Sequence, residues 1–170
     1  KMLSDRAPMD RGKAKVFFCN SGTEANEHAL TLARIATKKF ELIGLQNGFL
    51  GRGGLTMSLT GLGAWRAGLG PFMSGTLHLP GYHCYHCPLG HADREKCGTA
   101  CARYLSTLIK SQTSKRVAAV IVESIQGIGG IVEAPRDYFK VLKPILDENG
   151  ILLIVDEVQT GFGRTGKWFG

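Results

Sequence analysis

Two uninterrupted apolar runs, residues 117–122 and residues 151–155, constrain the fold of this chain more than any other feature. Short runs of this kind are typical of strands that are buried on both faces of a sheet. Between them, residues 138–146 have apolar positions at helical spacing, and Pro144 should weaken the last turn of that helix. A strand, a helix and a second strand in this order predict an α/β fold with a mostly parallel sheet and flanking helices.

The first half of the chain continues this alternation. Residues 15–19 form an apolar run that we interpret as a strand, and residues 41–46 are a second strand candidate. Residues 25–36 and residues 102–109 are expected to be helical. The glycine-rich stretch 44–75 is expected to hold turns and close approaches of the backbone.

Composition narrows the class of protein. The chain has 170 residues, of which 44% are hydrophobic and 21% charged, as in folded globular domains. No apolar run approaches the ~20 residues of a membrane helix, and the N-terminal residues lack the apolar core of a signal peptide. The net charge is +7, but the adjacent basic pairs, Lys38-Lys39 and Lys115-Arg116, form no stripe. We expect a cytoplasmic protein that binds neither membranes nor nucleic acid, and, since it begins on Lys1, an interior piece of a longer chain.

Polar or glycine-rich motifs follow three of the predicted strands. They span residues 20–27, 123–130 and 156–166. In parallel sheets ligands bind beyond the carboxyl ends of the strands. We therefore expect the three motifs to meet at one edge of the sheet and to form a binding site there.

The first motif has two interpretations, which the residues leave open. Ser21 and Glu24 have the spacing of a capping box, in which each side chain accepts a hydrogen bond from a free amide of the first helical turn. That role is purely structural. Alternatively, Gly22 allows a phosphate group to approach the amides at the positive end of the helix.

Asp156 ends a strand that is predicted to be buried. A carboxylate in that position is costly unless a cation or hydrogen bonds receive it. One aspartate beside a glutamate that faces the other way is a poor set of metal ligands. A protonated pyridine nitrogen is a better partner, and pyridoxal-phosphate (PLP) enzymes use an aspartate for it. A purely structural role for Asp156 is the alternative.

Four segments, in order along the chain, resemble the signatures of the class III (ω-type) aminotransferases, which are PLP enzymes of fold type I. The segments are Ser21-Gly22-Thr23-Glu24-Ala25-Asn26, Asn47-Gly48-Phe49-Leu50-Gly51-Arg52, Glu123-Ser124-Ile125-Gln126-Gly127-Ile128-Gly129-Gly130 and Asp156-Glu157-Val158-Gln159-Thr160-Gly161-Phe162-Gly163-Arg164. The resemblance implies pyridoxal 5'-phosphate as cofactor, an amino donor and an oxo-acid acceptor as substrates, and a homodimer when the protein is complete. It also implies that residues 1–170 are part of the large, PLP-binding domain, and that the rest of this domain and the small domain are absent.

The resemblance assigns the cofactor phosphate and the two ring faces to four residues. Gly22 and Thr23 would hold the phosphate through their amides and the Thr23 hydroxyl. Phe49 would stack on one face of the pyridine ring, and Val158 would press on the other. The structural alternatives are loop packing for Phe49 and plain core for Val158.

Three further residues are implied in the chemistry. Asp156 would pair with the ring nitrogen and keep it protonated, and Gln159 would donate a hydrogen bond to the 3-oxygen of the ring. Glu123 would lie near the substrate, where the family often uses it to manage an arginine from later in the chain. The alternative for Glu123 is a solvated carboxylate. Asp156 and Glu123 are thus the candidate catalytic residues.

The chain departs from the family pattern at two positions and lacks one residue. Ser124 stands where the family usually has proline, which should alter only the stiffness of the loop, and Leu50 stands where it often has histidine. In family members, the lysine that holds PLP as a Schiff base lies later in the sequence, beyond the motif that begins at Asp156 in this chain. Lys167 is the one lysine after that motif begins, and its position matches no family lysine.

A cysteine-rich insertion is expected at about residues 81–101. Cys84, Cys87, Cys97 and Cys101 have the spacing C-x₂-C-x₉-C-x₃-C, and the last two would share a helix face. Three interpretations remain open: a small zinc site, a structural cluster of reduced thiols, and redox or disulfide chemistry. In each of them we expect the insertion to have no catalytic role.

The reaction that the resemblance implies is transamination. A racemase, mutase or decarboxylase on the same scaffold would use the same ring-holding residues. A third possibility is a truncated chain without catalytic activity. The chain itself contains no feature that separates these three.

Overall fold

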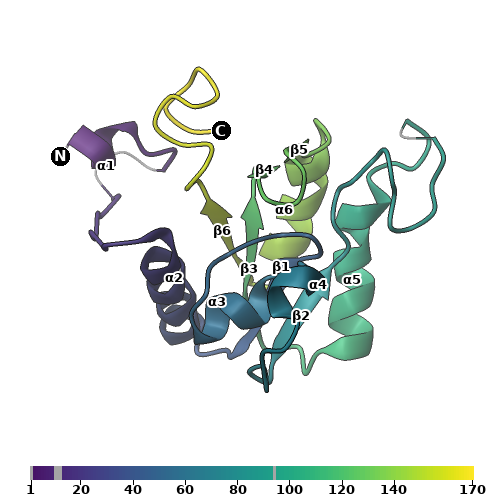
Figure 1. Ribbon diagram of the computed structural model, residues 1–170, viewed down its shortest axis with the longest axis horizontal. Coiled ribbons are helices and arrows are strands. Elements are labelled where there is room, and N and C mark those ends of the chain that lie inside the picture. Colours follow the sequence, from purple (N-terminus) through teal and green to yellow (C-terminus); the bar gives the residue numbers. More distant parts are fainter. Residues whose placement is uncertain (1, 10–12, 94) are drawn as a thin grey trace.

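The protein, described here from a computed structural model that covers residues 2–9, 13–93 and 95–170, is built on a four-stranded parallel sheet. The strand order is β2-β1-β3-β6, with the bounds Thr76–Leu79, Glu41–Leu45, Val117–Glu123 and Leu152–Asp156. All three strand pairs are parallel, and β1 and β3 lie in the centre. The predicted α/β fold with a parallel sheet and flanking helices is confirmed (Figure 1).

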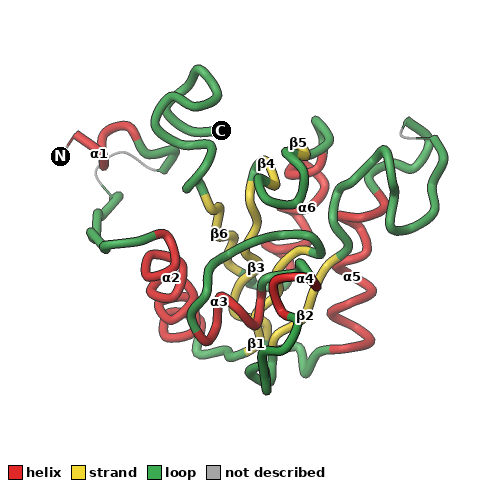
Figure 2. The backbone as a smooth tube through the Cα atoms, in the orientation of Figure 1, coloured by secondary structure: helices red, strands yellow, loops and turns green. Residues whose placement is uncertain are grey.

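Helices cover both faces of the sheet (Figure 2). On one face α5 (Ala100–Gln112) and α6 (Tyr138–Glu148) pack against Val120 and Val122 of β3. On the other face α2 (Gly22–Thr37) and α3 (Gly54–Leu59) pack against Ile121 of the same strand. Because successive strand side chains point to opposite faces, a continuous apolar strand contributes to both cores at once. This explains why residues 117–122 contain no polar position.

Four short elements complete the fold in the described residues. They are α1 (Met2–Arg6), α4 (Gly63–Arg66) and the antiparallel pair β4 (Ile125–Gln126) and β5 (Val132–Glu133). The C-terminal loop lies beyond the end of β6 (Figure 1), and Arg6 of α1 places its guanidinium 4.2 Å from the ring centroid of Trp168. None of the helices in the described ranges is both long enough and apolar enough to cross a membrane.

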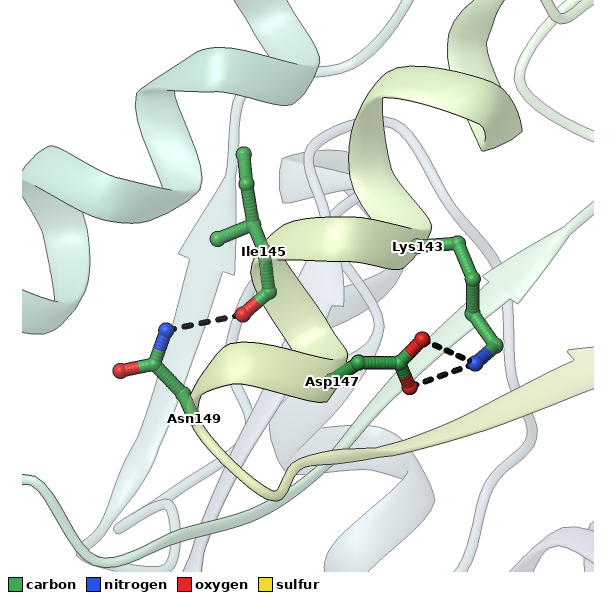
Figure 3. Close-up of polar contacts among 4 residues, drawn as sticks. All are labelled: Lys143, Ile145, Asp147 and Asn149. Atoms are coloured by element: carbon green, nitrogen blue, oxygen red, sulfur yellow. Dashed lines mark hydrogen bonds and ion pairs between the residues drawn. The ribbon is translucent and has the colours of Figure 1, made fainter.

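Helix α6 continues past Pro144 to Glu148, so the expected weakening does not end it. A proline lacks the amide that would donate to the carbonyl four residues earlier, here that of Lys140, and both residues are exposed. The last turn has two side-chain contacts (Figure 3). Asn149 donates to the carbonyl of Ile145 at 2.8 Å, and Lys143 pairs with both oxygens of Asp147.

One strand prediction is wrong, and a second is wrong in part. Residues 15–19 form no strand, and Phe17 and Phe18 are 70% and 80% exposed. The segment is apolar but has no strand beside it to supply backbone partners. Strand β6 exists, but it is an edge strand rather than a doubly buried one, with Leu152 42% and Val155 39% exposed. In the described ranges β6 pairs with β3 on one side only.

The glycine-rich stretch contains more regular structure than its composition indicates. It includes α3 and α4, and β2 follows directly after Gly75. Gly61 explains part of the glycine content, because a Cβ atom there would lie 2.1 Å from the carbonyl oxygen of Leu45. Glycine thus permits a close approach of two backbone segments here and does not mark the absence of structure.

Candidate active site

The carboxyl ends of β3 and β6 bring the two candidate catalytic residues together. Glu123 and Asp156 are register partners in this strand pair. Their exposed fractions are 6% and 8%, so both carboxyl groups are withdrawn from solvent. A pair of buried acids at adjacent strand ends is unfavourable unless other groups compensate for the lost hydration.

Two hydrogen bonds fix the Asp156 carboxylate. The side-chain amide of Asn26 donates to Oδ2 at 2.6 Å, and the backbone amide of Val158 donates to Oδ1 at 2.8 Å. Asn26 also donates to the carbonyl of Leu50 at 2.9 Å, so it joins α2 to the loop after β1. The sequence prediction gave Asn26 no role of its own. The sequence feature that could have identified Asn26 is its position four residues before Leu30, which places a polar side chain on the otherwise apolar inner face of the helix.

Burial raises the pKa of the Asp156 carboxyl above its ordinary value, while the hydrogen bonds from Asn26 and Val158 act in the opposite direction. The neighbouring Glu157 carboxyl raises this pKa further. A cation placed beside Asp156 would favour the charged form, since an opposite charge at short range lowers the pKa of an acid. The site is therefore suited to a positively charged partner.

Glu123 is anchored by two backbone amides. Phe49 donates to Oε1 at 2.8 Å and Gly127 donates to Oε2 at 2.9 Å. Burial raises the pKa of Glu123, the two amides lower it, and Asp156 raises it. The hydroxyl of Tyr82 donates to the backbone carbonyl of Glu123. Glu123 is thus not a solvated carboxylate, and it holds the Phe49 loop in place.

The N terminus of α2 confirms part of the predicted capping box. Ser21 is the N-cap, and its hydroxyl accepts from the amide of Glu24 at 3.2 Å. The Glu24 carboxylate reaches the amide of Asn20, at 2.7 Å, and not that of Ser21. The amides of Gly22 and Thr23 come before the first intrahelical donor, and so they lie where a helix binds anions. The capping and the anion-binding interpretations are compatible.

All of the predicted cofactor residues line one open cavity of about 220 Å³. They are Gly22, Thr23, Phe49, Asp156, Val158 and Gln159, and Glu123 lies in the same wall. Leu50, which replaces the family's frequent histidine, also contributes to the lining. The three motifs expected to meet, together with the segment after β1, therefore line one cavity, although residues 15–19 before the first motif form no strand.

The walls of the cavity are partly apolar. Val158 is 67% exposed, which excludes plain core as its role. A Cβ atom on Gly22 would lie 2.7 Å from Cγ2 of Val158, so the glycine allows the loop after β6 to approach the helix N terminus. Phe49 packs at a tilt of 59° on Trp65, with ring centroids 5.3 Å apart, and it also faces the cavity.

The residues present fit pyridoxal phosphate. The cavity combines helix-terminal amides for an anion, a buried carboxylate for a protonated nitrogen, and apolar side chains for a ring. Within the described ranges no lysine lines it. Lys167 instead lines a separate hollow of the C-terminal loop, beside Phe162 and Trp168.

The four clustered cysteines surround a second, small cavity of about 30 Å³. Cys84, Cys87, Cys97 and Cys101 all contribute to its lining, and none of them forms a disulfide. Burial raises the pKa of Cys101 to about 11. Cys97 lies before the first residue of α5, so the predicted shared helix face with Cys101 is wrong.

No group of three or more His, Cys, Asp or Glu side chains in residues 2–9, 13–93 and 95–170 is arranged to hold a metal ion. Zinc binding by the four thiols remains a hypothesis for metal analysis of the purified protein.

Replacing Cys84 and Cys87 together by serine is expected to lower the melting temperature of the complete protein by about 2–4 °C. The change puts two hydroxyls into an apolar cavity that thiols now line. Any turnover that the complete protein shows should stay within about twofold, because the cluster lies outside the Asp156 cavity. The Cys19→Ser variant, outside the insertion, is the control, and differential scanning calorimetry with steady-state assays supplies both measurements. A large loss of turnover with intact folding and full cofactor content would contradict the prediction.

The apoprotein should become less stable through Asp156 as pH rises. The pKa of this group is raised in the fold, so the folded state binds the proton more tightly than the unfolded state. Its stabilising contribution is complete below the ordinary value of 3.8 and is lost as pH rises through the folded pKa. The free energy of unfolding of wild type minus that of Asp156→Asn should therefore fall as pH rises above the ordinary pKa of 3.8. Urea titrations measure it, and a difference that rises with pH would refute the assignment.

Comparisons with known proteins give a family and several relatives for the whole chain. Residues 1–170 match the family described as Aminotransferase class-III. The chain is 40% identical over 168 residues to a leucine/methionine racemase of Thermococcus litoralis, an alignment that covers 98% of the chain and 37% of the racemase. It is 38% identical over 165 residues to an acetylornithine aminotransferase of Myxococcus xanthus, with 94% of the chain and 36% of that enzyme covered.

The fold has solved counterparts as well. The crystal structure of an amine transaminase from an uncultivated Pseudomonas species, in a PLP-bound form, matches with a TM-score of 0.85 and 34% identity. That match covers 92% of this chain and 36% of the transaminase. The chain thus spans little more than a third of the length of these relatives.

Proposed function

Because this chain belongs to the class III aminotransferase family, we propose that the complete protein is a PLP-dependent transaminase. It would move an amino group from an amino acid or an ω-amine to an oxo acid. The observation that carries the proposal is the convergence of Asp156, the α2 N terminus and the loop after β6 on one cavity. The pattern is what a ring with a protonated nitrogen and a phosphate requires.

The cofactor, when bound, supplies a ring that accepts electrons from the substrate. The chain's own residues hold and tune it. The Gly22 and Thr23 amides bind the phosphate, and Phe49 and Val158 orient the ring. Asp156 holds a proton at the ring nitrogen, and its fixed position, set by Asn26, means that little reorganisation is needed.

Gln159 and Glu123 complete the site. Gln159 donates a hydrogen bond to the 3-oxygen of the ring. Glu123 lies near the substrate and contacts an arginine supplied from elsewhere in the complete protein. Each of its oxygens accepts one backbone amide and keeps a lone pair for a further donor, so the anchoring and the arginine contact are compatible.

The complete protein acts as a homodimer in the cytoplasm under this proposal. The five cysteines form no disulfide in the structure, which fits a reducing compartment. Apolar side chains on β6 and α2, such as Val155, Leu32 and Ile35, are exposed in this chain. In the complete protein they would be buried by further residues of the same chain or by a second copy. Sedimentation of the complete protein tests the dimer.

One observation favours a second candidate function. The 40% identity to a leucine/methionine racemase makes amino-acid racemisation the alternative reaction. The complete protein should be incubated with single amino-acid enantiomers, with and without a 2-oxo acid. Formation of a new amino acid only when the oxo acid is present supports transamination. Inversion without the oxo acid supports racemisation. The absence of both products supports a non-catalytic chain.

A further inference from the structure

We propose that Ser124 is a positioning residue that sets how the loop after β6 presents Val158 and Gln159 to the cofactor. Ser124 directly follows Glu123 at the end of β3, and it is 9% exposed. Its hydroxyl donates to the hydroxyl of Thr160, in the loop after β6, at 3.1 Å. This inference rests on the proposed function, because the positioned residues act on pyridoxal phosphate.

The Thr160 hydroxyl donates one hydrogen bond and accepts another, and Ser124 is the donor of the second. The Thr160 hydroxyl gives its single proton to Oε2 of Glu157 at 2.5 Å. Its oxygen can then only accept, and Ser124 satisfies it. Thr160 is 3% exposed, so water has little access to replace the bond. The residue in place of the family's proline thus makes a hydrogen bond between two loops, which a proline could not donate.

The bond acts on the cavity through neighbours, since Ser124 is not among its lining residues. Thr160 directly follows Gln159, and the Gln159 side chain lies against Gly127, where a Cβ atom would be 2.5 Å from Cδ. Gly127 in turn donates to the Glu123 carboxylate. The loops after β3 and β6 are thus packed at Gly127 and joined by a hydrogen bond at Ser124. Loss of this bond should let the Gln159 loop shift.

The test uses the complete protein and three variants. Ser124→Ala removes the donor, and Ser124→Thr keeps it. Ser58→Ala is the matched control, because Ser58 is 1% exposed and donates to the carbonyl of Gly54 at 2.6 Å, but does not line the cavity. Two properties are measured for each: the dissociation constant of pyridoxal phosphate from the apoprotein, and the pH midpoint of the visible absorbance of the bound cofactor. The second depends on the hydrogen bond to the 3-oxygen of the ring.

Ser124→Ala is expected to weaken cofactor binding about three- to tenfold and to shift the pH midpoint. Ser124→Thr should resemble wild type. Ser58→Ala should lower the melting temperature and leave both cofactor properties unchanged. Equal values for wild type and Ser124→Ala would overturn the inference, and so would an equal shift in Ser58→Ala.

Two further outcomes are also decisive. If Ser124→Ala does not fold, Thr160→Val removes the same hydrogen bond from the acceptor side, together with the bond from Thr160 to Glu157, and must also shift both cofactor properties. An unshifted Thr160→Val variant would overturn the inference. A wild-type protein that binds no pyridoxal phosphate would refute the proposed function and the inference with it. Binding by wild type without any effect of Ser124→Ala refutes the inference alone.

Discussion

Asp156→Asn in the complete protein is expected to retain the cofactor and to lose about two to three orders of magnitude in turnover. The Asn side chain can still accept the hydrogen bond from the Val158 amide, and the helix N terminus still binds the phosphate. A neutral amide cannot hold the ring nitrogen protonated. The ring therefore accepts electrons less well, and proton abstraction from the substrate slows. Steady-state turnover and cofactor absorbance, measured on the same preparation, separate the two effects.

The control for this experiment is Asp147→Asn on α6. Asp147 pairs with Lys143 at the surface, where ion pairs contribute little (Figure 3). This variant should have wild-type turnover and cofactor content. Near wild-type turnover of Asp156→Asn would remove Asp156 from its proposed role. Loss of the cofactor together with turnover would instead make Asp156 a binding residue.

The second large effect concerns the 170-residue chain by itself, which is expected to show no detectable amino transfer even if the complete protein is active. The reaction needs a lysine that attaches the cofactor covalently and then moves a proton. In the described residues no lysine lines the Asp156 cavity, and Lys167 lines a different hollow. The exposed apolar side chains of β6, Leu152 and Val155, should also make the isolated chain fold poorly.

Borohydride reduction in the presence of pyridoxal phosphate, followed by peptide mapping, tests this prediction. The isolated chain should give weak labels spread over several surface lysines. The complete protein should give one dominant labelled peptide. A single specific label on Lys167 in the isolated chain, together with measurable amino transfer, would contradict the prediction.

Local patterns in the sequence were sufficient for the main elements of the fold. The apolar run 117–122 became β3, the run 151–155 became β6, and the helical spacings became α2, α5 and α6. These predictions succeeded because burial leaves a local pattern along the element itself: an uninterrupted apolar run in the strands and a helical period in the helices. Apolarity alone did not predict pairing. Residues 15–19 are as apolar as a strand, yet they have no neighbouring strand and stay outside the sheet.

The candidate site was also largely accessible from the sequence. In a parallel sheet the carboxyl ends of strands share an edge, so motifs that follow strands must meet there. The rule and the family resemblance together placed Phe49, Asp156 and Gln159 at one cavity, because these residues lie at or after the ends of β1 and β6. Gly22 was placed there by the resemblance alone, since residues 15–19 before it form no strand. The order of the motifs along the chain therefore predicted which residues share the cavity, without knowledge of any interatomic distance.

What only the tertiary structure decided are the contacts between residues far apart in the sequence. Asn26 and Asp156 are separated by 130 positions, and Tyr82 and Glu123 by 41. Such pairs depend on strand register and on the way each loop crosses the edge of the sheet, and no local period encodes either. Ser124 shows this most clearly. In the sequence, Ser124 is only a departure from the proline that the family usually has at this position. It becomes the donor to Thr160 because β3 and β6 lie side by side in register.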